Sequence, residues 1–109
     1  MNREQKLELL FVYGTLKEPV VQQDVIGRLI AGIPAILEGY KMSNISINGT
    51  FYPNLIPMTE GLIEGLLLTV TLEELELIDQ YETEAYQRLK LLLKNGQEAW
   101  VYIANQGTH

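Results

Sequence analysis

The sequence predicts one α+β domain, in which a small and mostly antiparallel β-sheet or β-barrel is flanked by short helices. Three observations support this prediction. The chain has 109 residues without an internal repeat or a dividing linker, and a single core usually organises roughly 100–200 residues, so residues 1–109 are expected to form one domain. Asn48-Gly49 and Asn95-Gly96 are hairpin-turn sequences between strand-like stretches. Thr71-Leu72-Glu73-Glu74 has the pattern of a helix capping box.

The first half of the chain is expected to contain a buried strand, a helix and a second strand. Leu7–Tyr13 is a dense apolar run, and its length and aromatic content favour a strand over a helix. Pro19 suits the first turn of a helix, where its missing N–H costs nothing. This helix is expected to continue until Gly32 and Pro34. Ala35–Ile47 then has the alternating pattern of a strand.

The second half is expected to supply the remaining strands and the capped helix. Phe51–Pro57 contains two prolines, which predicts an edge strand or an ordered loop. Leu62–Val70 is a predicted strand in which Gly65 marks a bulge or a close backbone approach. Tyr86–Leu93 and Glu98–Ala104 are predicted to form a hairpin. The capped helix should bury one apolar stripe, made of Leu72, Leu75, Ile78 and Tyr81.

The composition argues against several classes of function. Fourteen acidic and eight basic residues give a net charge of −6, which repels the phosphate backbone of nucleic acids. There is no cysteine and the single histidine is the terminal His109, so thiolate or multi-histidine metal sites and a histidine-based triad are excluded. Apolar runs such as Leu91–Leu93 are far shorter than the ~20 residues that span a bilayer. Met1–Lys6 is not followed by a signal-peptide core. We therefore expect a cytoplasmic protein that needs no metal or cofactor and binds neither nucleic acid nor membrane.

The segment Tyr13-Gly14-Thr15-Leu16 is the first candidate site. A glycine at the point where a strand gives way to a turn lets successive backbone N–H groups point outward and form a small anion nest. Such a nest could hold a carboxylate or a developing oxyanion. The plainer explanation is that Gly14 permits a tight turn, and these residues alone leave both explanations open.

Two carboxylates form the second candidate site. Asp79 and Glu82 lie three residues apart in the last turn of the predicted helix, where the helix dipole is negative. Mutual repulsion and the dipole both favour protonation, so the pKa of at least one of them should rise towards the range of a general base. The alternative is an ordinary solvated helix end.

Several tyrosines lie on or beside the predicted strands, namely Tyr52, Tyr86 and Tyr102. A tyrosine ring usually packs at the edge of the core with its hydroxyl group satisfied near the surface. The functional alternative is that some of these hydroxyl groups line a small polar cavity. The sequence by itself favours packing.

The order of short segments along the chain resembles the γ-glutamylcyclotransferase-like family, which includes γ-glutamylamine cyclotransferases and AIG2-like proteins. The resemblance extends over nearly the whole chain, and no single motif decides it. The segments that carry it are Val12–Lys17, Glu38–Tyr40, Tyr52-Pro53, Gly61–Leu67, Leu77–Glu82 and Tyr86–Arg88.

This resemblance implies a small β-barrel with flanking helices, a cavity at one side and a set of site residues. Glu82 falls on the catalytic acid–base glutamate of the family, and Asp79 on an aspartate that looks structural. Thr83 departs from the pattern, because many relatives have glycine directly after the glutamate. The residues implied to bind the γ-glutamyl substrate are Tyr13, Gly14, Thr15, Leu16, Tyr86, Arg88 and Tyr102.

The implied reaction releases 5-oxoproline from a γ-glutamyl amine or a γ-glutamyl amino acid, by attack of the α-amine on the γ-carbonyl, without a cofactor. The leaving amine and the oligomeric state are not predicted. Two alternatives remain open at this point. One is a non-catalytic module that binds small molecules on the same fold, and the other is a structural or partner-binding domain.

Overall fold

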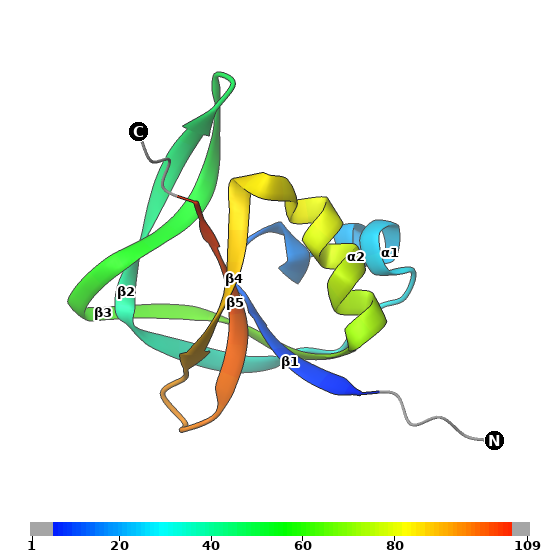
Figure 1. Cartoon of the computed structure of the whole chain (residues 1–109). Coiled ribbons are helices and arrows are strands. Elements are labelled where there is room, and N and C mark those ends of the chain that lie inside the picture. Colours follow the sequence, from blue (N-terminus) through cyan, green and yellow to red (C-terminus); the bar gives the residue numbers. More distant parts are fainter. Residues whose placement is uncertain (1–5, 106–109) are drawn as a thin grey trace.

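The computed structural model of the chain describes residues 6–105, so the terminal His109 lies outside the described part. Strands and helices cover most of these residues (Figure 1). Two one-turn 3₁₀ helices, Thr15–Lys17 and Thr83–Ala85, lie between them. In chain order the other elements are β1 (Leu7–Val12), α1 (Pro19–Ile26), β2 (Ile33–Ile47), β3 (Thr50–Thr71), α2 (Leu72–Glu82), β4 (Tyr86–Leu92) and β5 (Glu98–Ala104).

The strands form one curled five-stranded sheet in the order β2-β3-β1-β5-β4. Neighbouring strands are antiparallel except for β1 and β5, which are parallel. The turn after β4 reaches back to the other edge of the sheet, because Leu93 bridges to Leu37 and the N–H of Lys94 donates to the oxygen of Ile36 at 2.9 Å. The sheet is therefore a half-barrel, and the α+β prediction with a barrel-like, mostly antiparallel sheet is confirmed.

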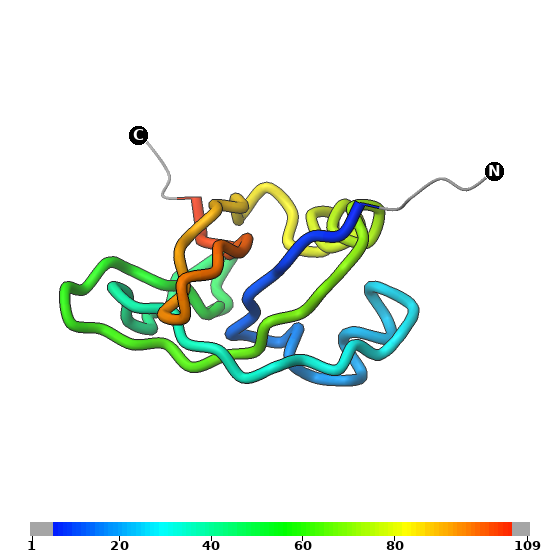
Figure 2. Tube along the Cα trace, turned by 90° about the horizontal axis from the view of Figure 1, so that it is seen from below, coloured from blue at the N-terminus to red at the C-terminus, as the bar shows by residue number. Residues whose placement is uncertain are grey.

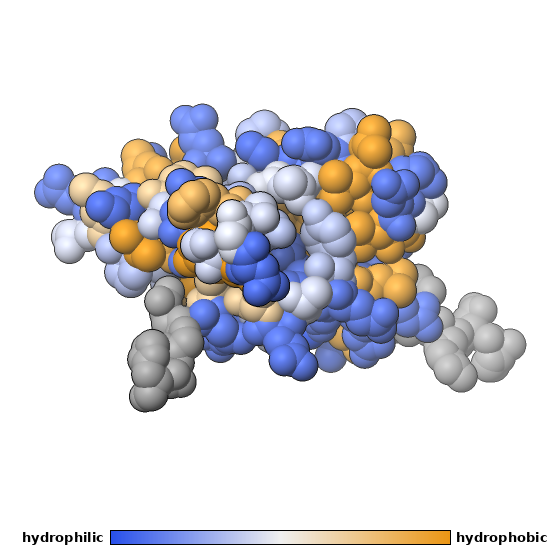
Figure 3. All heavy atoms as spheres, turned by 90° about the horizontal axis from the view of Figure 1, so that it is seen from above, coloured by the Kyte–Doolittle hydropathy of each residue, from blue (hydrophilic) through white to orange (hydrophobic). Residues whose placement is uncertain are grey.

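Both helices pack towards one end of the sheet, while β2 and β3 extend to the opposite end (Figure 2). On the face that Figure 3 shows, apolar side chains gather over the helical end. Val20 on α1 and Leu77 on α2 are among the exposed apolar residues of the molecule. Alternation along the strands sorts the remaining apolar residues into two cores. On β1, Leu10 and Val12 face the core beneath the helices, and Phe11 faces the core inside the curled sheet.

Helix α2 starts where the capping box predicts. The N–H of Glu74 donates to the hydroxyl oxygen of Thr71, and the N–H of Thr71 donates to the Glu74 carboxylate. Leu75 and Ile78 are fully buried against the sheet. Leu72 and Tyr81 are 39% and 42% exposed, so the predicted apolar stripe is confined to the middle of the helix. Tyr81 lies instead in the last turn, beside Glu82.

Two boundaries differ from the prediction. Helix α1 ends at Ile26 and not near Gly32, because Gly27 adopts a left-handed conformation (φ 89°) and its N–H caps the last turn. The stretch with the two prolines is not separate from the next predicted strand: both belong to the 22-residue β3, which pairs with β2 over this part.

The glycines explain how the sheet bends. Gly65 marks a close approach, as predicted, because an added Cβ would clash with the oxygen of Val12 and would lie 2.7 Å from the Phe11 ring. The register of β2 and β3 shifts at Gly39, between Glu38 and Tyr40, so the bulge lies there.

Candidate active site

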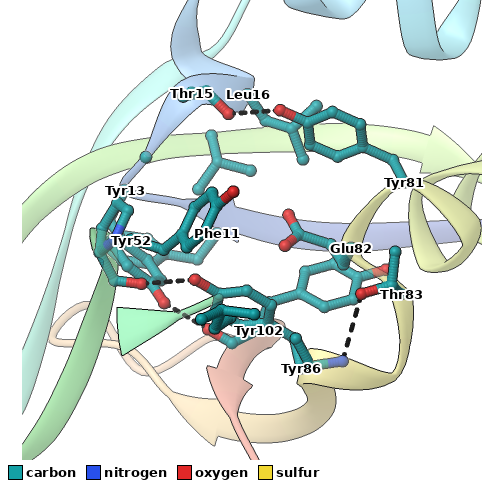
Figure 4. Close-up of a pocket in the computed structure, with 15 residues that line it drawn as sticks. Phe11, Tyr13, Thr15, Leu16, Tyr52, Tyr81, Glu82, Thr83, Tyr86 and Tyr102 are labelled. Atoms are coloured by element: carbon teal, nitrogen blue, oxygen red, sulfur yellow. Dashed lines mark hydrogen bonds between the residues drawn. The ribbon is translucent and has the colours of Figure 1, made fainter. Parts of the chain in front are cut away.

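A cavity of about 320 Å³ lies between the exit of β1, the far half of the β2–β3 hairpin and the C-terminal end of α2 (Figure 4). Its wall is mainly aromatic and apolar, and Glu82 is the one lining residue among those described that carries a full charge. The lining residues are Phe11, Val12, Tyr13, Gly14, Thr15, Leu16, Ile47, Tyr52, Pro53, Tyr81, Glu82, Thr83, Ala85, Tyr86 and Tyr102.

Glu82 is the last residue of α2, and its carboxylate points into the cavity (Figure 4). Thr83 turns the chain directly after it with a positive φ of 65°, and the N–H of Thr83 donates to the oxygen of Asp79. Within residues 6–105, no hydrogen bond or ion pair engages the Glu82 carboxylate. Burial, with a smaller contribution from the negative charge of Asp79, raises the pKa of Glu82 from 4.5 to about 7. A group with this pKa can both accept and donate a proton near neutral pH.

The Tyr13–Leu16 segment lies across the cavity from Glu82 and begins a single 3₁₀ turn. Two carbonyl groups of this segment accept hydrogen bonds: the N–H of Lys17 donates to the oxygen of Gly14, and the N–H of Glu18 donates to that of Thr15. No hydrogen bond found among residues 6–105 outside the regular strands and helices has the N–H of Gly14, Thr15 or Leu16 as its donor. Three consecutive main-chain donors are therefore available at the cavity wall, as an anion nest requires.

Three tyrosine rings form much of the wall, and each hydroxyl group donates to a fixed acceptor. Tyr13 donates to the main-chain oxygen of Tyr102 at 2.5 Å, Tyr86 to that of Pro53 at 2.7 Å, and Tyr102 to the Asp79 carboxylate at 2.5 Å. Burial, the largest cause for each, raises the pKa of Tyr86 to about 12 and also raises the pKa values of Tyr13 and Tyr102. All three rings are therefore neutral at pH 7, and they line the cavity in addition to packing.

The exposed side of the cavity carries a contact that the sequence gave no reason to expect. The hydroxyl groups of Thr15 and Tyr81 lie 2.7 Å apart and link the 3₁₀ turn after β1 to the last turn of α2. The position of Tyr81 directly before Glu82 could have indicated that its hydroxyl group lies at the site. The helical spacing predicted instead that its ring is buried in the apolar stripe.

Arg88 does not line the cavity. Its guanidinium group donates to both oxygens of Asp79, at 2.7 and 2.9 Å, and lies over the Trp100 ring at 4.5 Å from the ring centre. Burial alone would raise the pKa of Asp79, but the hydrogen bonds from Arg88 and Tyr102 outweigh it and lower that pKa. Asp79 is thus held by neighbouring groups, in keeping with a structural role, and substrate binding by Arg88 stays a prediction.

The described residues contain no group of three or more histidine, aspartate or glutamate side chains placed to hold a metal ion. None of their helices is long and apolar enough to cross a membrane.

The fold and the cavity together define a class: a small α+β domain with a curled mixed sheet, which places one partly buried glutamate opposite free main-chain N–H groups. The chain belongs to the family described as gamma-glutamyl cyclotransferase, AIG2-like, whose model matches residues 10–109. The resemblance carried by the ordered segments is thereby confirmed.

Individual relatives agree with this assignment. AIG2-like protein C of Arabidopsis thaliana is 34% identical over 80 residues, which cover 72% of this chain and 45% of that protein. The chain spans about half the length of the curated relatives it matches. A solution structure of an Arabidopsis thaliana protein has a TM-score of 0.76 at 25% identity, covering 95% of this chain and 66% of that one. A structure of a gamma-glutamyl cyclotransferase has the same fold, with a TM-score of 0.74 at 16% identity over 92% of this chain and 68% of that one.

Proposed function

We propose that the protein releases 5-oxoproline from a γ-glutamyl compound, with Glu82 as the acid–base residue. The observation that carries the proposal is the placement of the Glu82 carboxylate, with a pKa of about 7, across a cavity from the free N–H groups of Gly14, Thr15 and Leu16. Membership of the cyclotransferase family supports the reaction class.

Substrate binding follows from the charges at the two sides of the cavity. The α-carboxylate of a γ-glutamyl group is an anion, and the N–H groups of Gly14, Thr15 and Leu16 can donate hydrogen bonds to it without a cationic side chain. The α-ammonium group then faces the Glu82 carboxylate, which is the charged group of the lining. The tyrosine rings enclose the carbon chain, and their oxygen lone pairs can accept hydrogen bonds from the ammonium group.

The chemistry moves two protons from the α-nitrogen to the leaving nitrogen, and Glu82 carries the first of them. Glu82 takes a proton from the α-ammonium group, and the free amine attacks the γ-carbonyl carbon of the same molecule. A C–N bond forms within a five-membered ring, and the negative charge collects on the carbonyl oxygen. When the bond to the original amine breaks, Glu82 gives this proton to the leaving nitrogen. The ring nitrogen, which is positively charged after the attack, loses a second proton to become the neutral lactam, and the released amine takes that proton up as an ammonium group. The products are 5-oxoproline and a free amine, with no oxidant, reductant or water consumed.

Alignment of the substrate and proton transfer by Glu82 are the two sources of the rate acceleration. A well-aligned intramolecular attack reaches effective molarities of about 10⁵–10⁸ M, so a cavity that folds the substrate accounts for much of the acceleration. Acid–base catalysis by a carboxyl group with a suitable pKa adds roughly 10²–10⁴-fold. The neutral tyrosine rings reduce the amount of water around Glu82, which strengthens its electrostatic interaction with the α-ammonium group.

The test is the Glu82→Gln variant, which keeps the shape of the side chain and removes the base. Wild-type protein and variant are incubated with a panel of γ-glutamyl amino acids and γ-glutamyl amines, and 5-oxoproline is detected by mass spectrometry. Glu84→Gln is the matched control, because Glu84 is exposed two residues away and does not line the cavity. We expect product from the wild type and the control, and a loss of at least about 100-fold in E82Q.

Two results would overturn the proposal. The first is an E82Q variant that releases 5-oxoproline at the wild-type rate. The second is a wild-type protein that gives no product across the panel while γ-glutamyl compounds raise its melting temperature, which is the behaviour of a binding module.

We also propose a cytoplasmic location, in keeping with the cysteine-free composition.

A further inference from the structure

The last turn of α2 presents two carboxylates with opposite surroundings. Asp79 and Glu82 are three residues apart, so they are neighbours on the helix surface, with Cβ atoms about 5–6 Å apart. Both lie at the negative end of the helix dipole. Both carboxylate oxygens of Asp79 accept hydrogen bonds, whereas Glu82 faces the cavity and has no such partner within residues 6–105.

The hydrogen bonds that hold the Asp79 carboxylate come from two different strands. From β4, Arg88 donates through Nε and Nη2 to the two carboxylate oxygens, which is the bidentate geometry that fixes a carboxylate most firmly. From β5, Tyr102 donates to one of the same oxygens. The guanidinium group is itself held against the Trp100 ring. Asp79 and Arg88 are 38% and 22% exposed, so their charges are only partly screened by water.

The other groups that face Glu82 are neutral. Tyr13 after β1, Tyr86 on β4 and Tyr102 on β5 line the same cavity, and their raised pKa values keep all three hydroxyl groups protonated at pH 7. The hydroxyl groups of Thr15 and Tyr81 are hydrogen-bonded to each other at the exposed side of the cavity. Among the described residues, Asp79 is the charged group that acts on Glu82 in addition to burial. Arg88 is the cation paired with Asp79.

We propose that the Asp79–Arg88 ion pair is an electrostatic positioning device that sets how strongly Glu82 holds the proton it transfers. Asp79 strengthens the hold on the proton, because a negative charge nearby disfavours a second carboxylate. Arg88 limits this effect by balancing Asp79. This role of the ion pair extends the function proposed above, and its effect on catalysis rests on that function. Arg88 thereby becomes a positioning residue that acts through Asp79, outside the cavity.

The proposal predicts shifts of opposite sign for two single substitutions. Asp79→Asn removes the negative charge, so the carboxylate form of Glu82 becomes easier to reach and its titration midpoint falls. Arg88→Gln leaves Asp79 unbalanced, so the midpoint rises. We expect each shift to be about 1 pH unit, at the low end of the effect of a charge within ~6 Å, because Asp79 is partly exposed to water.

The direct measurement is an NMR titration of the side-chain carboxyl carbon of Glu82 in the protein without substrate. It does not depend on turnover, so it tests this inference even if no cyclotransferase activity is found. Where activity is found, the midpoint of the acid limb of kcat/KM should move in the same direction as the NMR midpoint. Arg88→Lys keeps the charge and loses the two-pronged contact, and its midpoint should stay close to that of the wild type. If R88Q fails to fold, Asp79→Asn still decides, because an unmoved midpoint in that variant overturns the proposal.

The chain supplies a matched control at the other end of the same helix. Arg28 forms an equivalent two-pronged ion pair with Glu74, at 2.6 and 2.9 Å, and neither residue lines the cavity. Arg28→Gln should therefore leave the Glu82 midpoint unchanged. Midpoints that do not move in D79N and R88Q would overturn the proposal, and so would shifts in the same direction, which would indicate general disturbance of the cavity. A higher KM for R88Q at an unchanged midpoint would instead make Arg88 a substrate ligand.

Discussion

Burial of Glu82 should cost the folded protein stability at neutral pH, and the Glu82→Gln variant measures that cost. The pKa of Glu82 is about 7 in the fold and 4.5 ordinarily, so folding favours the protonated form. Well below pH 4.5 the group is neutral in both states, and the fold bears no penalty. Between 4.5 and about 7 the unfolded chain loses its proton first, so the wild type loses stability as the pH rises.

The size of this effect follows from the two pKa values. At about 1.4 kcal/mol for each pH unit between them, the penalty reaches ~3 kcal/mol above pH 7. Solvent that enters the cavity screens the charge and makes this an upper value. Glutamine does not titrate, so E82Q should match the wild type near pH 4 and exceed its unfolding free energy by about 2–3 kcal/mol at pH 8.

The assay is urea denaturation of both proteins at a series of pH values between 4 and 8. The slope with denaturant should be the same for both proteins, because the surface exposed on unfolding is unchanged. Glu84→Gln controls for the change in net charge, since it removes an exposed carboxylate two residues away. If the difference between E82Q and the wild type is the same at pH 4 and pH 8, the Glu82 carboxylate is solvated in both states and the reasoning about the cavity fails.

Three further outcomes are expected. Thr83→Gly should raise the unfolding free energy by about 1 kcal/mol in urea denaturation, because φ 65° with ψ −171° suits glycine and strains threonine, whereas Thr83→Ala should not. Gly65→Ala should lower it by about 2 kcal/mol, since the new methyl group meets the Phe11 ring at 2.7 Å, while Gly14→Ala, with a nearest contact at 3.6 Å, should leave it within about 0.5 kcal/mol. The kcat/KM for 5-oxoproline release should rise about tenfold per pH unit below pH 7 and level off above it, as steady-state rates across pH 5–9 would show, because Glu82 must be ionised to act as the base.

Features decided by a few neighbouring residues could be predicted from the sequence. The Thr71 capping box is present, and both Asn48 and Gly49 have positive φ, which is the hairpin turn expected of Asn-Gly. These features depend on local hydrogen bonds and backbone preferences, which the residue types fix. The end of α1 is local too, but the prediction placed it near Gly32 and Pro34, whereas Gly27 adopts the left-handed conformation that ends the helix.

Features that depend on distant segments could not be predicted. The two prolines in Phe51–Pro57 predicted an edge strand or an ordered loop, and this stretch is strand that pairs with β2 and not with β1. Its continuation into Leu62–Val70 as one strand, β3, was not predicted, because it depends on the pairing with β2. The parallel pairing of β1 with β5 joins the two ends of the chain and leaves no local pattern. Which side of a tyrosine ring meets a cavity is likewise a tertiary property. The resemblance identified Tyr86 and Tyr102, while the residues themselves favoured packing.

The two carboxylates at the end of α2 show why helix position alone does not define a site. The sequence places Asp79 and Glu82 in one electrostatic setting, since they share a helix turn and the negative end of its dipole. The fold then gives the two carboxylates different surroundings. Arg88, nine residues beyond Asp79, returns on β4 to pair with it, and Asp79 becomes more acidic. Glu82 turns into a cavity without a cation of its own, and its pKa rises. A pair of acids whose pKa values are driven apart in this way can divide the work, one held ionised as a fixed charge and the other free to carry a proton.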